Sequence, residues 1–203
     1  MKHLRFIAIA VLAIISANVS AQKAVNLGLP SGTLWADRNV GASSPGDYGG
    51  YYAWGETSTK SDYTWDTYTH CDGNWDNCHN IGSNIAGTRY DVARQKWGGG
   101  WKMPTKAQWS ELRSECTWIW TTHGGHNGYK VTGPNGKSIF LPAAGHRCGT
   151  SSNGVGSYGV YWSATLSESG ANGAWSKLFD ICRYRMSGDY RSDGLTVRPV
   201  TER

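Results

Sequence analysis

Hydrophobic positions along this chain form short groups, and only two segments have the spacing of an amphipathic helix. In the first segment Tyr90, Ala93 and Trp97 recur at intervals of three and four residues, which places them on one helical face. The polar residues 88–91 can cap this helix at its start, and the glycine run 98–100 ends it.

The second helical segment follows Pro104. Thr105 and Gln108 match a capping box, in which the two side chains accept hydrogen bonds from each other's backbone N–H groups. Trp109, Leu112 and Cys116 then form an apolar stripe. We expect this face of the helix to pack on a sheet.

The remaining apolar groups have the pattern of short β-strands. Segments 129–132 and 137–141 flank the turn sequence Gly-Pro-Asn-Gly at 133–136, which predicts a hairpin. Further strands are expected at 160–164, 174–181 and 195–200, and short strands broken by turns at 25–36. Residues 57–87 are polar, aromatic and aperiodic, which is typical of a long ordered loop region.

Two helices among many short strands and long loops predict an α+β fold. The chain contains 27 glycines, a density that favours turns over helices. It also contains 11 Trp and 11 Tyr but only 3 Phe, and we expect most of the Trp side chains to lie in the core. We find no internal repeat and no linker, so residues 22–203 are assigned to a single domain.

The first 21 residues have the pattern of a secretory signal peptide. Lys2 and Arg5 precede the apolar run 6–15, and small residues lead to Ala21, after which we expect cleavage. About ten strongly apolar residues fall short of the roughly 20 needed to cross a bilayer, so no membrane span is expected. The mature chain would then start at Gln22 and be exported to the periplasm, the cell surface or the extracellular medium.

Charge excludes one class of partner. Without the signal peptide the chain carries 18 Lys and Arg residues against 15 Asp and Glu residues. This small excess is scattered, and no run of basic residues exists that could form a phosphate-binding stripe. We therefore expect no nucleic-acid partner.

Five cysteines in an exported chain are expected to be mostly paired. Cys71 and Cys78 lie close together in a turn-rich segment, so we predict a local disulfide between them. The neighbouring His70 and His79 leave a zinc site open as the alternative. The odd number leaves at least one thiol free or intermolecular, and no pairing can be assigned to the other three cysteines: Cys116, Cys148 and Cys182.

Motifs for catalysis or metal binding are weak in this sequence. His123 and His126 offer two imidazoles but no marked third ligand, and the oxygen-bearing residues 72, 74 and 76 lack the central Gly and the later Glu of an EF-hand. Glu56 and Asp62 are carboxylates without a marked acid/base partner. Neither a nucleophile elbow nor a phosphate loop occurs. We therefore predict neither enzymatic activity nor a bound metal or cofactor.

Several segments together resemble the "Fibrobacter succinogenes major paralogous domain" family. The matching pieces cover nearly the whole mature chain in order: LGLPSGTLWA at 27–36, NVGA at 39–42, YAWGET at 52–57, YDVA at 90–93, WGGGWKMPT at 97–105, IFLPAAG at 139–145, YWSA at 161–164 and GLTVRPV at 194–200. The resemblance implies a C-type-lectin-like fold, in which two helices flank a small twisted antiparallel sheet and long loops carry the ligand surface. The fold is shared with formylglycine-generating enzymes, but Cys182 is the one cysteine in the C-terminal region where those enzymes need a reactive thiol site, and we do not expect that activity.

The stretch from 167 to 193 carries the strongest sign of ligand binding. Trp162, Trp175, Phe179 and Val197 are expected to be framework residues. The residues between them are mainly Ser, Gly, Asp, Arg and Tyr, the types that antibody paratopes favour. Eight of these residues are predicted to form an exposed ligand-contact surface: Asp180, Arg183, Tyr184, Arg185, Asp189, Tyr190, Ser192 and Asp193.

Relatives that are diversified by retroelements are mutated in this same segment, mainly at asparagine codons. Such mutation yields no Lys, Glu, Gln, Met or Trp, and between Leu178 and Asp193 only Met186 belongs to that set. The composition fits a diversified variable protein, and it fits equally well an ordinary surface of a relative that is not diversified.

The sequence therefore predicts an exported, adhesin-like binding protein for an unknown protein or glycan ligand. A structural or pilus-associated subunit on the same scaffold is the first alternative. A carbohydrate-active enzyme is the second.

Overall fold

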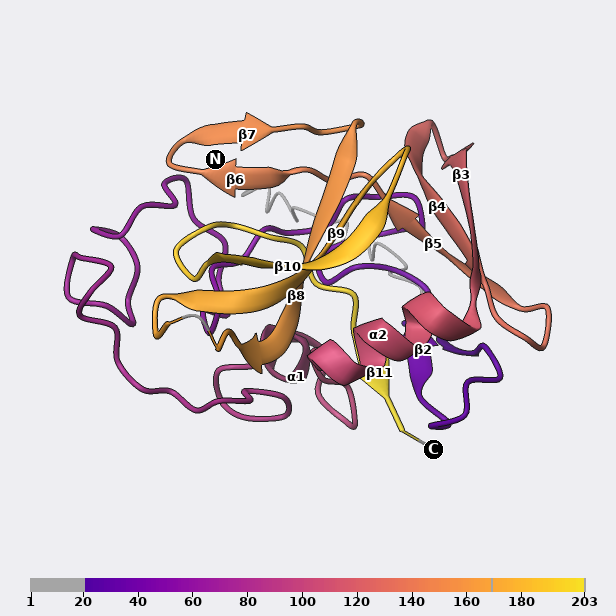
Figure 1. Ribbon diagram of the computed structural model, residues 1–203, viewed down its shortest axis with the longest axis horizontal. Helices are drawn as coiled ribbons and strands as arrows, with labels where there is room; N and C mark the ends of the chain where they lie inside the picture. The colour runs from indigo at the N-terminus through magenta and orange to yellow at the C-terminus, as the bar shows by residue number, and fades with distance from the viewer. Residues whose placement is uncertain (1–20, 169, 203) are drawn as a thin grey trace, which may run out of the picture.

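The computed structural model of the chain describes residues 21–168 and 170–202 (Figure 1). The signal peptide predicted for residues 1–21 lies outside the described residues except for Ala21. No helix in the described ranges is long and apolar enough to cross a membrane. Eleven strands form four small antiparallel sheets in these ranges. The sheets are β1 (Ala24–Asn26), β2 (Leu34–Ala36) and β11 (Val200–Thr201); β3 (Thr117–His123), β4 (His126–Thr132) and β5 (Ser138–Pro142); β6 (His146–Cys148) and β7 (Ser151–Asn153); and β8 (Tyr158–Leu166), β9 (Gly173–Asp180) and β10 (Tyr184–Tyr190).

The predicted α+β fold, with two helices flanking one twisted sheet as in C-type lectins, is wrong. The two helices of the described part are short: α1 (Val92–Trp97) has six residues and α2 (Lys106–Glu115) has ten. α1 ends because Gly98 follows at a φ of 65°, a left-handed conformation that glycine adopts without strain. α2 packs against β8, β9 and β10. So little of the described chain is helical that most of the architecture consists of small sheets joined by loops.

One of the four sheets, formed by β8, β9 and β10, lies near the middle of the molecule. Figure 1 shows β8, β9 and β10 near the middle, the β3–β4–β5 sheet to one side and the β6–β7 hairpin above. The segment between β2 and α1, residues 37–91, winds around the other side. It contains isolated bridges, such as the one between Tyr63 and Gly149. The long loop region predicted for residues 57–87 is thus confirmed.

Two local predictions are also confirmed. At the start of α2, Gln108 N donates to Thr105 Oγ1 at 3.2 Å, and Thr105 N donates to Gln108 Oε1 at 2.9 Å, which completes the capping box. The predicted hairpin is formed by β4 and β5, with Tyr129 paired to Leu141.

Aromatic side chains fill the core between α2 and the sheets. The ring centroids of Trp35 and Trp109 are 4.7 Å apart. Tyr161 continues this group, with its ring 5.9 Å from that of Trp109 and 5.6 Å from that of Phe179. The expectation that Trp residues lie in the core is confirmed for four that are 0% exposed: Trp35, Trp54, Trp109 and Trp162. Tight contacts between these rings fix the position of β9, and with it the neighbouring β10.

Candidate ligand-binding site

Most of the residues predicted to contact a ligand lie on or beside β10, which is an edge strand. The strand order of this sheet is β10–β9–β8, and β10 runs antiparallel to β9. Its pairing extends from Tyr184 opposite Phe179 to Tyr190 opposite Gly173. A strand of this length spans about 20 Å. Its two ends are therefore separate places on the surface.

At the first end, Asp180 stabilises the turn between β9 and β10. Its carboxylate accepts hydrogen bonds from Cys182 N at 2.9 Å and Arg183 N at 3.1 Å, and from Arg183 Nε at 3.0 Å. These bonds, with the one from Cys182 as the largest cause, hold the pKa of Asp180 below its usual value. Asp180 and Arg183 thus have a structural role in the turn, although the Arg183 side chain is exposed.

Tyr184 and Arg185 follow this turn. The ring of Tyr184 is half-buried because it stacks on Trp118 of β3, with 4.8 Å between the ring centroids. Arg185, on the other face of the strand, is exposed. Tyr184 therefore takes part in packing between two sheets, and its accessible surface is limited.

At the second end, three of the predicted residues line one cavity of about 470 Å³. Asp189, Tyr190 and Asp193 share this cavity with Asn172, Gly173 and Gly188. We call this group the β10 cavity. The two glycines have no side chain, so the polar groups and the Tyr190 ring provide most of its chemistry.

The two carboxylates of the β10 cavity have raised pKa values. Burial is the largest cause for Asp189, which accepts a hydrogen bond from Ser176 Oγ. For Asp193, burial and the negative charge of Asp189 raise the pKa to about 7, although a hydrogen bond with the Cys148 thiol acts against this shift. The pair is therefore not fully ionised at neutral pH.

Tyr190 provides an aromatic surface at the edge of the cavity. It is 58% exposed. Trp65, from the long loop region, contacts it edge to face with 5.7 Å between the centroids. This contact supports the ring from one side and leaves much of it accessible.

The prediction of an exposed surface is thus only partly correct. Ser192 is 2% exposed, so its predicted exposure is wrong, because the chain turns inward after Tyr190. Arg183, Arg185 and Tyr190 are exposed, and the other four predicted residues are half-buried: Asp180, Tyr184, Asp189 and Asp193.

The residues predicted as framework are mostly buried. Trp162, Phe179 and Val197 are each 0% exposed. Trp175 is half-buried, and Lys106 Nζ lies 3.6 Å from the centroid of its ring.

Sequence reasoning missed several residues that line the β10 cavity or contact its lining. Asn172, which precedes β9, lines the cavity. Trp65 of the long loop region contacts Tyr190, and Cys148 at the end of β6 hydrogen-bonds Asp193. His146 of β6 also acts on Asp189 through its charge, and its Nδ1 lies 2.9 Å from Tyr158 OH. No local motif marks these residues, because only the packing of the loops against β10 brings them together.

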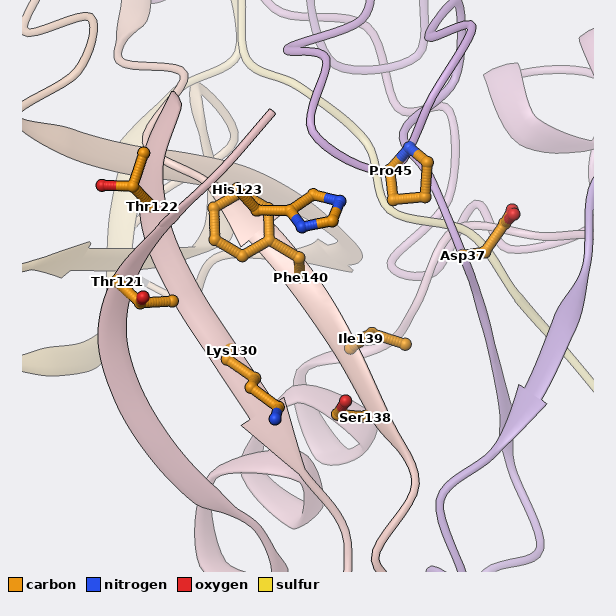
Figure 2. Close-up of a pocket in the computed structure, with 9 residues that line it drawn as sticks. All are labelled: Asp37, Pro45, Thr121, Thr122, His123, Lys130, Ser138, Ile139 and Phe140. Atoms are coloured by element: carbon orange, nitrogen blue, oxygen red, sulfur yellow. The ribbon is translucent and has the colours of Figure 1, made fainter. Parts of the chain in front are cut away.

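A further cavity, of about 420 Å³, lies against the β3–β4–β5 sheet (Figure 2). Figure 2 shows the rings of His123 and Phe140 beside each other, with Pro45 and Asp37 across from them. The Asp37 carboxylate already pairs with Arg38 Nη2 at 2.9 Å. None of the eight predicted contact residues lines this cavity. The β10 cavity is therefore the better candidate for ligand binding.

The two histidines of the β3–β4 turn do not share a partner. The His123 ring packs against the Phe140 ring, with 5.2 Å between the ring centroids. The His126 ring packs against the Tyr48 ring, with 4.4 Å between the centroids. Among residues 21–168 and 170–202, no group of three or more His, Cys, Asp or Glu side chains is arranged to hold a metal ion.

The predicted disulfide between Cys71 and Cys78 is confirmed. The histidines that left zinc open as an alternative have other partners. His70 Nε2 lies 3.1 Å from Gly55 O, and His79 Nε2 lies 2.8 Å from Asp72 Oδ1. The remaining cysteines are free, with Cys116 buried and both Cys148 and Cys182 exposed.

Comparisons of the chain with protein-family models, with curated proteins and with solved structures give no match. The resemblance drawn from the sequence segments therefore stays a prediction. The case for a function rests on the geometry and chemistry of the β10 cavity.

Proposed function

We propose that this chain is an exported binding protein that recognises a glycan at the β10 cavity. The observation that carries the proposal is the meeting of Asp189, Asp193 and Asn172 with the exposed Tyr190 ring around one cavity. Ligand sites typically combine an apolar surface with a few convergent polar groups.

The chemistry of these groups suits a ligand with many hydroxyl groups. A carboxyl group accepts hydrogen bonds and also donates one when it is protonated, and the Asn172 side chain can both donate and accept. A sugar offers hydroxyl donors and acceptors to them, and its C–H face can pack on the apolar face of Tyr190. A cationic ligand would need ionised carboxylates, but Asp193, whose pKa is raised to about 7, is partly protonated at neutral pH. This difference favours a neutral, hydroxyl-rich ligand over a basic peptide.

The groups around the cavity are held in place before a ligand binds. Asp189 accepts a hydrogen bond from Ser176 Oγ on β9, and Tyr190 packs on Trp65. Arg191 N donates to Asn172 O at 2.9 Å, which ties the loop before β9 to the end of β10. Such preorganisation lowers the entropic cost of binding.

The proposal is tested by measuring how the full purified protein binds to an array of neutral and acidic glycans. The variants Asp189→Asn and Tyr190→Ala should each weaken binding by about tenfold or more, because each removes a group that lines the cavity. Arg183→Ala, at the other end of β10, is the matched control and should bind like the wild type. Unchanged binding by folded Asp189→Asn and Tyr190→Ala would refute the proposal.

A carbohydrate-active enzyme is the second candidate, and one observation favours it. The pKa of Asp193, raised to about 7, is in the range of a general acid at neutral pH. Asp189 would be the second carboxylate that glycoside hydrolysis needs. The bound glycans should then release new reducing ends over time, and Asp193→Asn should abolish this release while glycan binding remains. An intact glycan after long incubation excludes this candidate.

A further inference from the structure

Another cavity, of about 540 Å³, lies next to the β10 cavity. Ala171 lines this cavity, and its neighbour in the chain, Asn172, lines the β10 cavity. Besides Ala171, its wall contains residues that follow the disulfide, residues at the end of β8 and the side chain of Arg191. We call it the Arg191 cavity. It differs from the β10 cavity because its wall contains a buried cation.

Arg191 is 1% exposed, and its guanidinium donates to three acceptors. Nε donates to Tyr68 OH at 2.9 Å, and Nη1 donates to Ala171 O at 2.7 Å and to His79 O at 3.3 Å. In the part of the chain that the structure describes, Nη2 has no hydrogen-bond acceptor. All three acceptors are neutral oxygens, so none of them cancels the positive charge.

Among residues 21–168 and 170–202, Arg191 forms no ion pair with a carboxylate. Its guanidinium lies 5.0 Å from the ring centroid of Trp54 and 5.4 Å from that of Tyr68, which stabilises the charge only in part. A buried charge without a counter-charge is costly, and proteins generally pair it.

Arg198 shows what a buried structural arginine looks like in this protein. It is 0% exposed, and each of its nitrogens has an acceptor: Asn39 Oδ1, Ala36 O and Phe140 O. The charge of Asp37 also acts on it. Arg191 differs from Arg198 because, of these two residues, only Arg191 has a nitrogen without an acceptor and lines a cavity.

We propose that the Arg191 cavity binds a small molecule through a carboxylate group. The carboxylate would supply the negative charge that Arg191 lacks. Nη2 is buried in the cavity wall, so the carboxylate would interact with the guanidinium mainly through its charge. This site does not depend on the glycan site proposed above.

One group on the cavity opposes an anion and limits its charge. Glu168 lines the cavity, is 77% exposed in its side chain and pairs with Lys106 Nζ at 3.2 Å. The ion pair reduces this repulsion, but a dianion would still experience more of it than a monoanion. A single carboxylate therefore fits the site better than a phosphate monoester.

NMR titration of the full purified protein with sodium glucuronate, and with glucose as the uncharged control, tests the site. Glucuronate should bind at least about tenfold more tightly than glucose, because the two differ mainly in the carboxylate. Arg191→Gln should remove this preference. Equal affinity of the wild type for both sugars would refute the proposal.

Two further variants keep the proposal testable if Arg191→Gln does not fold. Ala171 is exposed and lines the cavity, so Ala171→Trp should block glucuronate. Glu168→Gln should strengthen glucuronate binding by about twofold to threefold, since it removes a like charge at the site. Glu202→Gln, an exposed glutamate paired with Lys102, is the matched control and should change nothing. Glucuronate binding that persists in Ala171→Trp contradicts the assignment.

The Asp189→Asn variant separates this proposal from the glycan site. Glucuronate affinity should be the same in Asp189→Asn as in the wild type, because Asp189 does not line the Arg191 cavity. If the variant loses glucuronate binding, the sugar occupies the β10 cavity, and the carboxylate site is wrong. Failure of neutral glycans to bind would leave the glucuronate result unaffected.

Discussion

The indole of Trp118 on β3 stacks on the phenol ring of Tyr184 on β10, with 4.8 Å between the ring centroids and 8° between their planes. The two strands belong to different sheets and are both edge strands. Lys177 Nζ lies 4.9 Å from the Trp118 centroid and 5.2 Å from the Tyr184 centroid. Stacked rings thus connect two sheets that do not share backbone hydrogen bonds.

A double-mutant cycle measures this connection. Trp118→Ala and Tyr184→Ala should each lower the free energy of unfolding, and the two losses should be coupled by about 0.5–1.5 kcal/mol because the rings contact each other. Urea unfolding of the wild type, both single variants and the double variant gives the coupling. Tyr184→Phe keeps the ring and should cost little. Additive losses would show that the stacking does not stabilise the fold.

The sequence was informative where the interacting residues are near neighbours. Thr105 and Gln108 are three positions apart, Cys71 and Cys78 seven, and the β4–β5 turn contains four residues. Such contacts depend on local chain geometry, which residue types and spacing specify. The capping box, the disulfide and the hairpin were accordingly correct.

The fold class was wrong because it depends on contacts between distant segments. The spacing of Trp109 and Leu112 predicted which face of α2 is buried. It did not predict how much of the fold consists of sheets. Residues 195–200 are all buried and were expected to be a strand, yet only Val200 pairs within β11. The residue pattern of a short segment does not reveal which partner its backbone will bind.

Composition predicted part of the candidate site. Asp189, Tyr190 and Asp193 were found because their residue types favour recognition. The same argument selected Asp180, whose carboxylate is used by the turn, since composition does not distinguish exposed side chains from those that hydrogen-bond the backbone. Asn172 was missed because it is a single polar residue in a glycine-rich loop.

Loss of the Arg198 guanidinium should strongly destabilise the protein. Arg198→Met would leave Asn39 Oδ1, Ala36 O and Phe140 O without their donor in the core. We expect the free energy of unfolding to fall by about 3–5 kcal/mol, as for other broken buried polar networks. Arg185→Met on the exposed face of β10 is the control and should change stability by about 0.5 kcal/mol or less. Urea unfolding of both variants and the wild type measures the two changes. Similar losses of unfolding free energy in Arg198→Met and Arg185→Met would contradict the structural role of Arg198.

The Cys71–Cys78 disulfide should stabilise the long loop region. It closes a loop with a sequence separation of seven, for which restriction of the unfolded chain predicts about 2.5 kcal/mol. The double variant Cys71→Ser and Cys78→Ser should therefore unfold at a lower urea concentration than the wild type. Cys182→Ser removes an exposed free thiol and serves as the control. An unchanged midpoint in the double variant would mean that the loop is held by its other contacts.

The stability of the protein should depend on pH through Asp193. Its pKa is raised from 3.8 to about 7 by burial and by the charge of Asp189. Between these two values the folded protein binds a proton that the unfolded chain has released, so the free energy of unfolding falls as the pH rises. Asp189, whose pKa burial also raises, acts in the same direction. His146 acts in the opposite direction, because burial lowers its pKa and its contribution to stability is lost as the pH falls.

Urea unfolding of the wild type and Asp193→Asn at pH 5 and pH 7 isolates this contribution. Asparagine mimics the protonated carboxyl group and does not titrate, so the variant should lose less stability over this interval than the wild type does. Lys177, whose pKa burial lowers to about 7, titrates near the upper end of this interval, but it is present in both proteins. The effects of His146 are common to both proteins and cancel in the difference. An equal change of stability in the wild type and the variant would mean that Asp193 ionises in the folded protein as it does in the unfolded chain.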